Sequence, residues 1–188
     1  MAHYFKYFPT VEYDIKKNGK PITVPNIFVG LKVRDLVQRK KAVFYEYNVQ
    51  EDERADTIAF KYYGDATLDW VIFLTNQIID PQFEWPLDRR SLDNYITKKY
   101  GSLQSATSTV HHYEQILQAQ TTTYDGITVP ERTVQVDEAT YNSLGGNERK
   151  VIYNYDYELD LNDKKREIKL LDERYIINLI NSIEEELA

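Results

Sequence analysis

Residues 54–81, "RADTIAFKYYGDATLDWVIFLTNQIIDP", contain the strongest structural signals in the sequence. Ile58, Ala59 and Tyr62 fall at the spacing of one helical face. Gly64 follows them, and glycine is the residue that most readily takes the left-handed conformation at a helix end. The sequence therefore predicts a short amphipathic helix that ends at Gly64.

A second helix is expected directly after this glycine. Asp65 or Thr67 is a suitable N-cap, and the residues "LDWVIFL" (68–74) leave almost no polar face. A helix that is apolar on nearly all sides is buried in a core. Asp80-Pro81 should stop it, because proline cannot continue a helix.

Extended segments are predicted on both sides of the helix pair. "VFYEYNV" (43–49) alternates and is rich in β-forming residues, and "FEWPL" (83–87) is expected to be a short extended return. The unit is then strand–helix–helix–strand. Before it, the pattern predicts a helix near residues 32–40, and "KKNGKP" (16–21) is typical of a turn.

The second half is expected to be mainly β. A helix from Ser91 to Gly101 precedes Ser-, Thr- and Gln-rich connections around a strand, "VHHYEQIL" (110–117). Apolar and polar residues alternate over 151–161, which predicts a long strand that forms a hairpin with "REIKLL" (166–171). Asp172 then caps an amphipathic C-terminal helix.

The predicted fold class is therefore α+β. We expect a strand–helix–helix–strand module with an added helix, then a β-rich hairpin region, then the amphipathic C-terminal helix. The expected organisation is an N-terminal extension with a helix (1–42), the module with its following helix (43–101), the β-rich region (102–171) and the C-terminal helix (172–188).

Composition limits the possible functions. The chain has 188 residues, a net charge of −7, no cysteine and 16 tyrosines. A negative chain disfavours nucleic acid as a ligand, and without cysteine there is no disulfide or thiolate chemistry. No apolar run approaches the roughly 20 residues of a membrane span, and no secretory signal is expected at the start. Tyrosines suit surfaces that bind other proteins, and they also fill strands.

Residues able to do chemistry are few. His111 and His112 are adjacent in a predicted strand and should point to opposite faces, so no metal site is expected. The carboxylates that crowd before the first helix (Glu51, Asp52, Glu53, Asp56) could in principle form a glycosidase pair. Acidic residues at a helix N-terminus are already explained by capping and by the helix dipole. We therefore expect no enzyme activity and no cofactor.

The helix pair resembles a LysM module, a small β-α-α-β fold known for binding N-acetylglucosamine polymers. The resemblance lies in "YNV" (47–49), "YYG" (62–64), Asn76 and "IIDP" (78–81), with Ile58-Ala59. In sugar-binding members a Gly-Asp-Thr turn forms one wall of the groove. Here that turn falls on Asp52, Glu53 and Arg54, so the fold is retained while the sugar-contacting residues differ.

Nearly the whole chain resembles the baseplate wedge protein family of contractile-tailed bacteriophages, the gene 53 family of T-even-like phages. The resemblance is carried by "YFPTVEYD" (7–14), "VPNIFVGLKVRD" (24–35), residues 54–87, "NYITKKYG" (94–101) and "REIKLLDERYI" (166–176). It implies a structural protein with a LysM-like domain that docks on wedge-core proteins and helps wedges join around the tail hub. It also implies a place in the virion tail baseplate after assembly in the host cytoplasm.

If partners bind the rim of the module and the C-terminal helix, aromatic and arginine anchors should carry the contacts. The candidates are Arg54, Tyr62, Tyr63, Phe83, Trp85, Ile176, Leu179, Ile183 and Leu187. The partners would be other wedge and hub-proximal tail proteins, without nucleic acid or membrane. Two alternatives stay open: a LysM-type binder of peptidoglycan or N-acetylglucosamine, and a wall-degrading enzyme that uses the carboxylates near Asp52.

Overall fold

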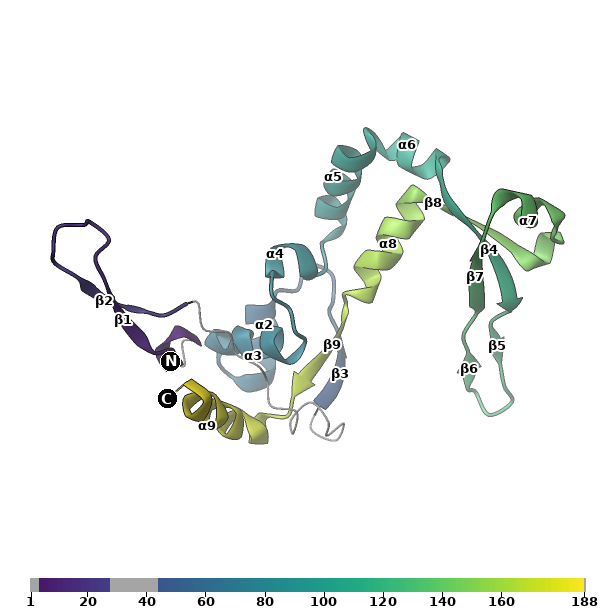
Figure 1. The fold of residues 1–188 in the computed structure, drawn as a ribbon. Coiled ribbons are helices and arrows are strands. Elements are labelled where there is room, and N and C mark those ends of the chain that lie inside the picture. Colours follow the sequence, from purple (N-terminus) through teal and green to yellow (C-terminus); the bar gives the residue numbers. More distant parts are fainter. Residues whose placement is uncertain (1–3, 28–43, 188) are drawn as a thin grey trace. The chain divides into compact units, whose positions relative to one another are not determined.

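The computed structural model describes residues 4–27 and 44–187 (Figure 1). The helix predicted near residues 32–40 lies outside the described residues. The chain divides into two compact units, of which unit 1 comprises the residues up to Pro86 and from Lys165 onward, and unit 2 comprises Leu87–Lys164. Both helices and strands contribute, so the α+β class is confirmed.

The elements follow the division into units. Unit 1 holds η1 (Tyr4–Tyr7), β1 (Thr10–Tyr13), β2 (Ile22–Pro25), β3 (Phe44–Asn48), α2 (Ala55–Tyr63), η3 (Ala66–Leu68), α3 (Asp69–Thr75), α4 (Pro81–Glu84), β9 (Glu167–Leu171), η5 (Glu173–Tyr175) and α9 (Ile176–Leu187). Unit 2 holds α5 (Arg89–Tyr100), α6 (Leu103–Ser108), β4 (Val110–Gln118), β5 (Thr121–Thr122), β6 (Thr128–Val129), β7 (Arg132–Val136), α7 (Glu138–Ser143), η4 (Gly146–Glu148), β8 (Arg149–Tyr153) and α8 (Asn154–Lys164).

The central helix pair forms as its sequence predicts. Helix α2 ends at Gly64, whose φ of 75° is left-handed and whose N–H donates to the carbonyl oxygen of Phe60. Asp65 then caps η3, because its Oδ1 accepts the backbone N–H of Thr67 at 2.9 Å. Helix α3 continues from this turn and buries Trp70, Val71 and Ile72. The apolar run that decides the fold is therefore the centre of the core of unit 1.

The strand that closes the strand–helix–helix–strand order is β9, which lies far along the chain from the helices. It pairs antiparallel with β3, so that Tyr45 lies opposite Leu170 and Tyr47 lies opposite Ile168. Ile168 and Leu170 are buried against the helices, as the alternation predicts. The core of unit 1 consists of Val49, Ile58, Ala59, Leu68, Trp70, Val71, Ile72, Ile168, Leu170, Leu171, Leu179 and Ile183.

The prediction that "FEWPL" returns as an extended strand is wrong. Pro81–Glu84 form α4, in which proline occupies the first turn, where its missing N–H costs nothing. Asp80 caps this helix by accepting the N–H of Gln82 at 3.1 Å. Trp85 is extended, but it pairs with no strand among the described residues.

The prediction of a long strand over 151–161, forming a hairpin with 166–171, is also wrong. The strand β8 ends at Tyr153 and the chain continues as α8. On α8, Tyr155, Glu158, Leu159 and Asn162 lie at helical spacing and face the core of unit 2. Two of these positions are polar, so the helical period does not stand out in the sequence.

Unit 2 combines a three-stranded antiparallel sheet, in the order β7-β4-β8, with a small helical core. The expected strand over 110–117 is confirmed as β4. Helix α5 ends at Gly101, as predicted, but its N-cap is Asp88 rather than Ser91, since Asp88 Oδ1 accepts the Ser91 N–H at 2.9 Å. The buried members of the helical core are Leu92, Ile96 and Ala106.

Candidate functional site

The loop between β3 and α2 is organised around Glu53, which is almost fully buried. Its Oε2 accepts the hydroxyl of Tyr47 at 2.8 Å and the backbone N–H of Gln50 at 3.1 Å, and its Oε1 accepts Lys61 Nζ at 2.6 Å. The indole N–H of Trp85 donates to the Glu53 carbonyl oxygen at 3.0 Å. The conformation of the loop is therefore fixed by the buried Glu53.

These bonds fix the charge state of Glu53. Burial alone would raise the pKa of this carboxyl, but the hydrogen bonds from Lys61, Gln50 and Tyr47 together lower it. Burial and the neighbouring carboxylate raise the pKa of the Tyr47 hydroxyl to about 12. Glu53 is thus an anion that accepts the hydrogen bonds of the loop. Its lowered pKa is the opposite of the raised pKa that a general acid requires.

The other carboxylates of the predicted acidic group have different surroundings. Glu51 Oε2 lies 2.6 Å from Arg166 Nη2, and Asp56 Oδ2 lies 3.1 Å from Arg54 Nη2. Asp52 is exposed and has a left-handed φ of 59°. Three of the four carboxylates are therefore engaged in ion pairs within the chain.

Asn76, which belongs to the LysM-like motif, is a structural clamp. Its Nδ2 donates to the carbonyl oxygens of Ile72 and Lys169, both at 2.8 Å, and its Oδ1 accepts the Lys169 N–H at 2.7 Å. The side chain thereby pairs with the backbone of β9 and ties the end of α3 to it. The amide groups that a ligand would need are already occupied.

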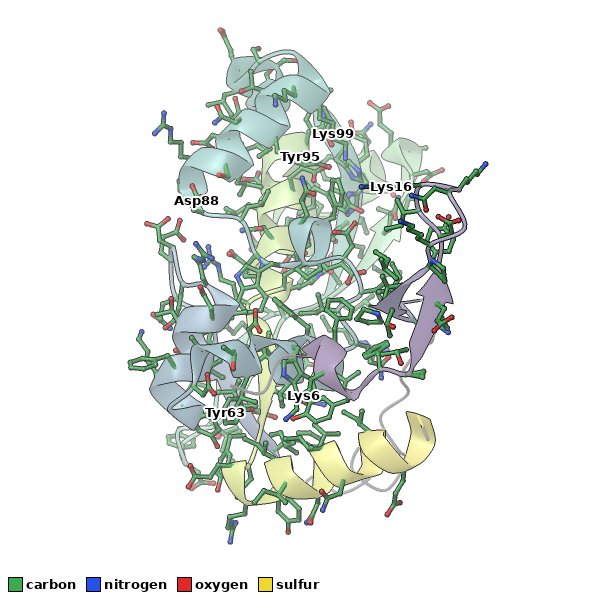
Figure 2. The ribbon with its side chains drawn as sticks, turned by 90° about the vertical axis from the view of Figure 1, so that its left-hand side faces the viewer. Lys6, Lys16, Tyr63, Asp88, Tyr95 and Lys99 are labelled. Atoms are coloured by element: carbon green, nitrogen blue, oxygen red, sulfur yellow. The ribbon has the colours of Figure 1, made fainter. Side chains whose placement is uncertain are left out.

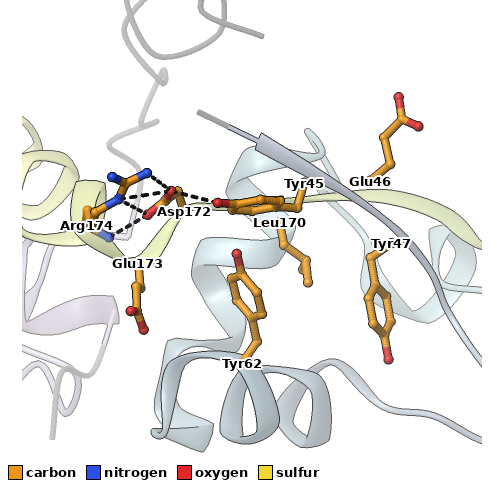
Figure 3. A pocket seen from close by; sticks show the side chains of 8 residues that line it. All are labelled: Tyr45, Glu46, Tyr47, Tyr62, Leu170, Asp172, Glu173 and Arg174. Carbon is orange, nitrogen blue, oxygen red and sulfur yellow. Dashed lines mark hydrogen bonds and ion pairs between the residues drawn. The ribbon is translucent and has the colours of Figure 1, made fainter. Parts of the chain in front are cut away.

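A groove of about 460 Å³ opens beside the β3–β9 pair (Figure 3). Figure 3 shows Arg174 and Tyr45 reaching Asp172 from opposite sides, at 2.6 Å and 3.2 Å from its Oδ2. Hydrogen bonds from the Arg174 side chain and backbone lower the pKa of Asp172. The ring of Tyr62 lies edge-on to that of Tyr45, with 6.1 Å between their centroids.

The groove combines aromatic walls with negative charge. Its lining residues are Tyr45, Glu46, Tyr47, Tyr62, Leu170, Asp172, Glu173 and Arg174. Burial is the main cause that raises the pKa of the Tyr62 hydroxyl; the nearby Tyr45, Asp172 and Glu173 raise it further and Arg174 lowers it. Tyrosine faces beside carboxylates can accept a cationic side chain. This groove is not predictable from the sequence, because its two sides come from segments that are far apart along the chain.

The residues predicted to bind partners differ in exposure. Arg54 and Phe83 are exposed, and Phe83 keeps 69% of its surface open. Tyr62, Tyr63, Trp85 and Ile176 are half-buried and pack against the core of unit 1. Leu179 and Ile183 are buried in that core, and the side chain of Leu187 lies outside the described residues.

Other apolar residues of unit 1 are more open than most of those predicted. Ile79 is 90% exposed, Ile177 is 70% exposed and Phe60 is 62% exposed. Phe60 follows the buried Ile58 by two positions, so a helical projection places it away from the core. Ile79 follows the helix end and precedes Asp80-Pro81, a position whose exposure no periodic pattern reveals.

No three His, Asp or Glu side chains of residues 4–27 and 44–187 lie together as a metal site would require. In the same part of the chain, no helix has the length and apolar character needed to cross a bilayer.

Comparison with known families decides the assignment. A model of the family described as "Base plate wedge protein 53" matches residues 3–184. The chain belongs to this family. No curated protein matches the chain. This membership confirms the resemblance to the wedge protein family inferred from the sequence. It makes the chain a structural protein of a phage base plate wedge and a component of the virion tail.

Proposed function

We propose that this wedge protein docks on the core proteins of the wedge and helps wedges assemble around the tail hub. The contacts would be protein–protein contacts made by unit 1. The main support for the proposal is that the turn before α4 and α4 itself hold two large apolar side chains, Ile79 and Phe83, open to solvent. Apolar anchors of this kind supply most of the binding energy of protein interfaces.

The turn that carries these anchors is fixed before any partner arrives. Glu84 Oε2 accepts the backbone N–H groups of Ile79 at 2.7 Å and Asp80 at 3.2 Å. Lys165 Nζ donates to the carbonyl oxygen of Phe83 at 2.7 Å. A surface held in this way loses little conformational entropy on binding, which favours its use as a docking site.

We further propose that β3, α2, α3 and β9 form a LysM-like module that has lost sugar binding. The order of elements and the antiparallel strand pair support the likeness. Against sugar binding stand the buried Glu53, bonded to Tyr47 and Lys61, and the fully engaged amide of Asn76. The ion-paired carboxylates Glu51 and Asp56 likewise support a protein without enzyme activity.

The docking test compares two substitutions on one helix. We expect Phe83→Asp to weaken binding to co-expressed wedge-core proteins by about tenfold or more, as loss of a central anchor does. Gln82→Asp adds the same charge one residue earlier, at an exposed position, and should bind as the wild type does. Equal binding by the two variants in a quantitative pull-down would remove Phe83 from the interface.

Calorimetry tests the alternative that the protein binds N-acetylglucosamine polymers. Titration of N-acetylglucosamine oligomers into the protein should give no saturable heat. A saturable isotherm would restore the LysM-type binder. Turbidity of a cell-wall suspension should stay constant in the presence of the protein, and clearing that Glu53→Gln abolishes would instead indicate an enzyme.

A further inference from the structure

The β1–β2 hairpin of unit 1 has two unlike faces. In the antiparallel register Val11 lies opposite Val24 and Tyr13 lies opposite Ile22. Because side chains alternate along a strand, these four apolar residues share one face. The other face carries Thr10, Glu12, Thr23 and Pro25. The pattern is that of a strand pair with one face meant for burial.

The apolar face is nevertheless open. Tyr13 is 60% exposed, Ile22 is 51% exposed and Val11 is 42% exposed, and Ile15, directly after β1, is 61% exposed. An isolated two-stranded hairpin is at best marginally stable in water unless something covers its apolar face. Contiguous apolar surface of this kind marks interaction sites in soluble proteins.

The loop that joins the strands is ordered and positively charged. Asp14 Oδ2 accepts the Gly19 N–H at 2.7 Å, and Asn18 Oδ1 accepts the Lys20 N–H at 3.1 Å. Figure 2 labels Lys16, which lies in this loop with Lys17 and Lys20. Within residues 4–27 and 44–187, these three lysines form no ion pair. A chain with a net charge of −7 thus carries three lysines within five residues at the end of an apolar strip.

We infer that the β1–β2 hairpin is a docking arm that covers an apolar strip on another protein. Its lysines pair with carboxylates at one end of that strip. Charge complementarity identifies the occupant as an acidic protein surface, because the cations are confined to the loop and the apolar side chains to one face. The inference rests on the proposed function only in that the partner is another base plate protein, and it involves neither Phe83 nor the groove at Tyr45.

A photo-crosslinking experiment reads the two faces separately. A photoreactive phenylalanine analogue is placed at Ile22 on the apolar face or at Thr23 on the opposite face, and the protein is co-expressed with the other wedge proteins. We expect an adduct with one wedge protein from position 22 and none from position 23. A zero-length amine–carboxylate cross-linker should join Lys16 or Lys20 to Asp or Glu of the same protein.

Substitutions give the energetic counterpart. Tyr13→Thr combined with Ile22→Thr keeps residues that favour strands but removes the apolar face, and it should weaken binding to that wedge protein about tenfold. Glu12→Gln combined with Thr23→Ser changes the other face and should bind as the wild type does. Lys16→Gln with Lys20→Gln should slow association and flatten its dependence on salt.

The possible outcomes divide cleanly. If the wild-type chain binds no wedge protein, the proposed function fails, whereas wild-type binding that the Tyr13 and Ile22 substitutions leave unchanged overturns the docking arm alone. Adducts only with a second copy of the chain, or equal adducts from both faces, would also overturn it. Binding to vesicles containing anionic lipid, lost in the lysine variants, would mean that the arm meets a membrane instead of a protein.

Discussion

Replacing Asn76 by leucine should destabilise unit 1, because this amide holds β9 against the end of α3. The change removes three hydrogen bonds, two donated to Ile72 and Lys169 and one accepted from Lys169, at 2.8, 2.8 and 2.7 Å. Each hydrogen bond contributes about 1 kcal/mol net. Water can replace part of the bonding to the exposed Lys169, so we expect a loss of about 1–3 kcal/mol in the free energy of unfolding.

The assay is urea unfolding followed by the fluorescence of the two tryptophans, Trp70 in the core of unit 1 and Trp85 packed against it. Asn76→Asp keeps the acceptor for the Lys169 N–H but replaces both donated bonds by repulsion between oxygens, so it should cost at least as much as leucine. Asn178→Leu is the matched control, since this exposed asparagine of α9 lies in the same unit. Hydrogen exchange of the Lys169 amide should accelerate in Asn76→Leu, which removes the acceptor of that N–H.

A small effect would contradict the role assigned to Asn76. If Asn76→Leu lowers the free energy of unfolding by less than about 0.5 kcal/mol, the range of ordinary surface substitutions, the clamp does not hold the strand. An unchanged exchange rate at Lys169 would lead to the same conclusion.

Three further predictions concern charged groups. Hydrogen bonds lower the pKa of Glu53 in the folded protein. Its contribution to stability is therefore present above its pKa in the unfolded chain, about 4.3, and is lost as pH falls through the folded pKa. Glu53→Gln should flatten that part of a plot of unfolding free energy against pH. Lys99→Met should lower the thermal midpoint by an amount equivalent to about 1–2 kcal/mol, because it leaves the buried Glu158 without its ion-pair partner at 2.6 Å. The loss is limited because Tyr100 still donates a hydrogen bond to Glu158. A midpoint within error of the wild type would contradict this prediction. Burial and His112 lower the pKa of His111 in the folded protein, so the unfolded chain takes up the proton first as pH falls. Stability should therefore fall as pH drops below about 6.5. A His111→Phe variant that shows the same loss would contradict the attribution of this loss to His111.

The sequence predicts those elements whose signals are local. The end of α2 at Gly64 follows from backbone geometry, and the burial of Trp70–Ile72 follows from a run without a polar face. The C-terminal helix begins close to where Asp172 predicts, although one turn of 3-10 helix, capped by the Asp172 carboxylate, precedes it. In each case neighbouring residues suffice to decide the conformation.

Long-range partners explain what the sequence does not predict. The alternation over 151–161 fits a strand, but α8 forms because Glu158 and Asn162 find partners inside unit 2. Glu158 accepts from Lys99 and Tyr100, and Asn162 bonds both backbone groups of Leu87. A buried polar residue looks like a surface residue until its partner is known.

The same limit applies to the candidate site. The groove at Tyr45 needs Asp172 and Arg174 from the other end of the chain. The strand that pairs with β3 is β9, not "FEWPL", and the whole of unit 2 separates these two strands in the sequence. The sequence identified Glu53 and Asn76 as positions of interest. Their bonds to Lys61 and to the backbone of Lys169 reveal that both serve the fold.

The pairing of β3 with β9 also determines when the protein can fold during synthesis. Residues 44–48 leave the ribosome long before residues 167–171, so the helix pair must wait for its second strand while all of unit 2 is translated. Unit 2 is continuous in sequence and can form first, which brings the two strands within reach of each other and shortens the loop that must close. A chain truncated after residue 166 and released from the ribosome should therefore contain a protease-resistant unit 2 and a protease-sensitive helix pair.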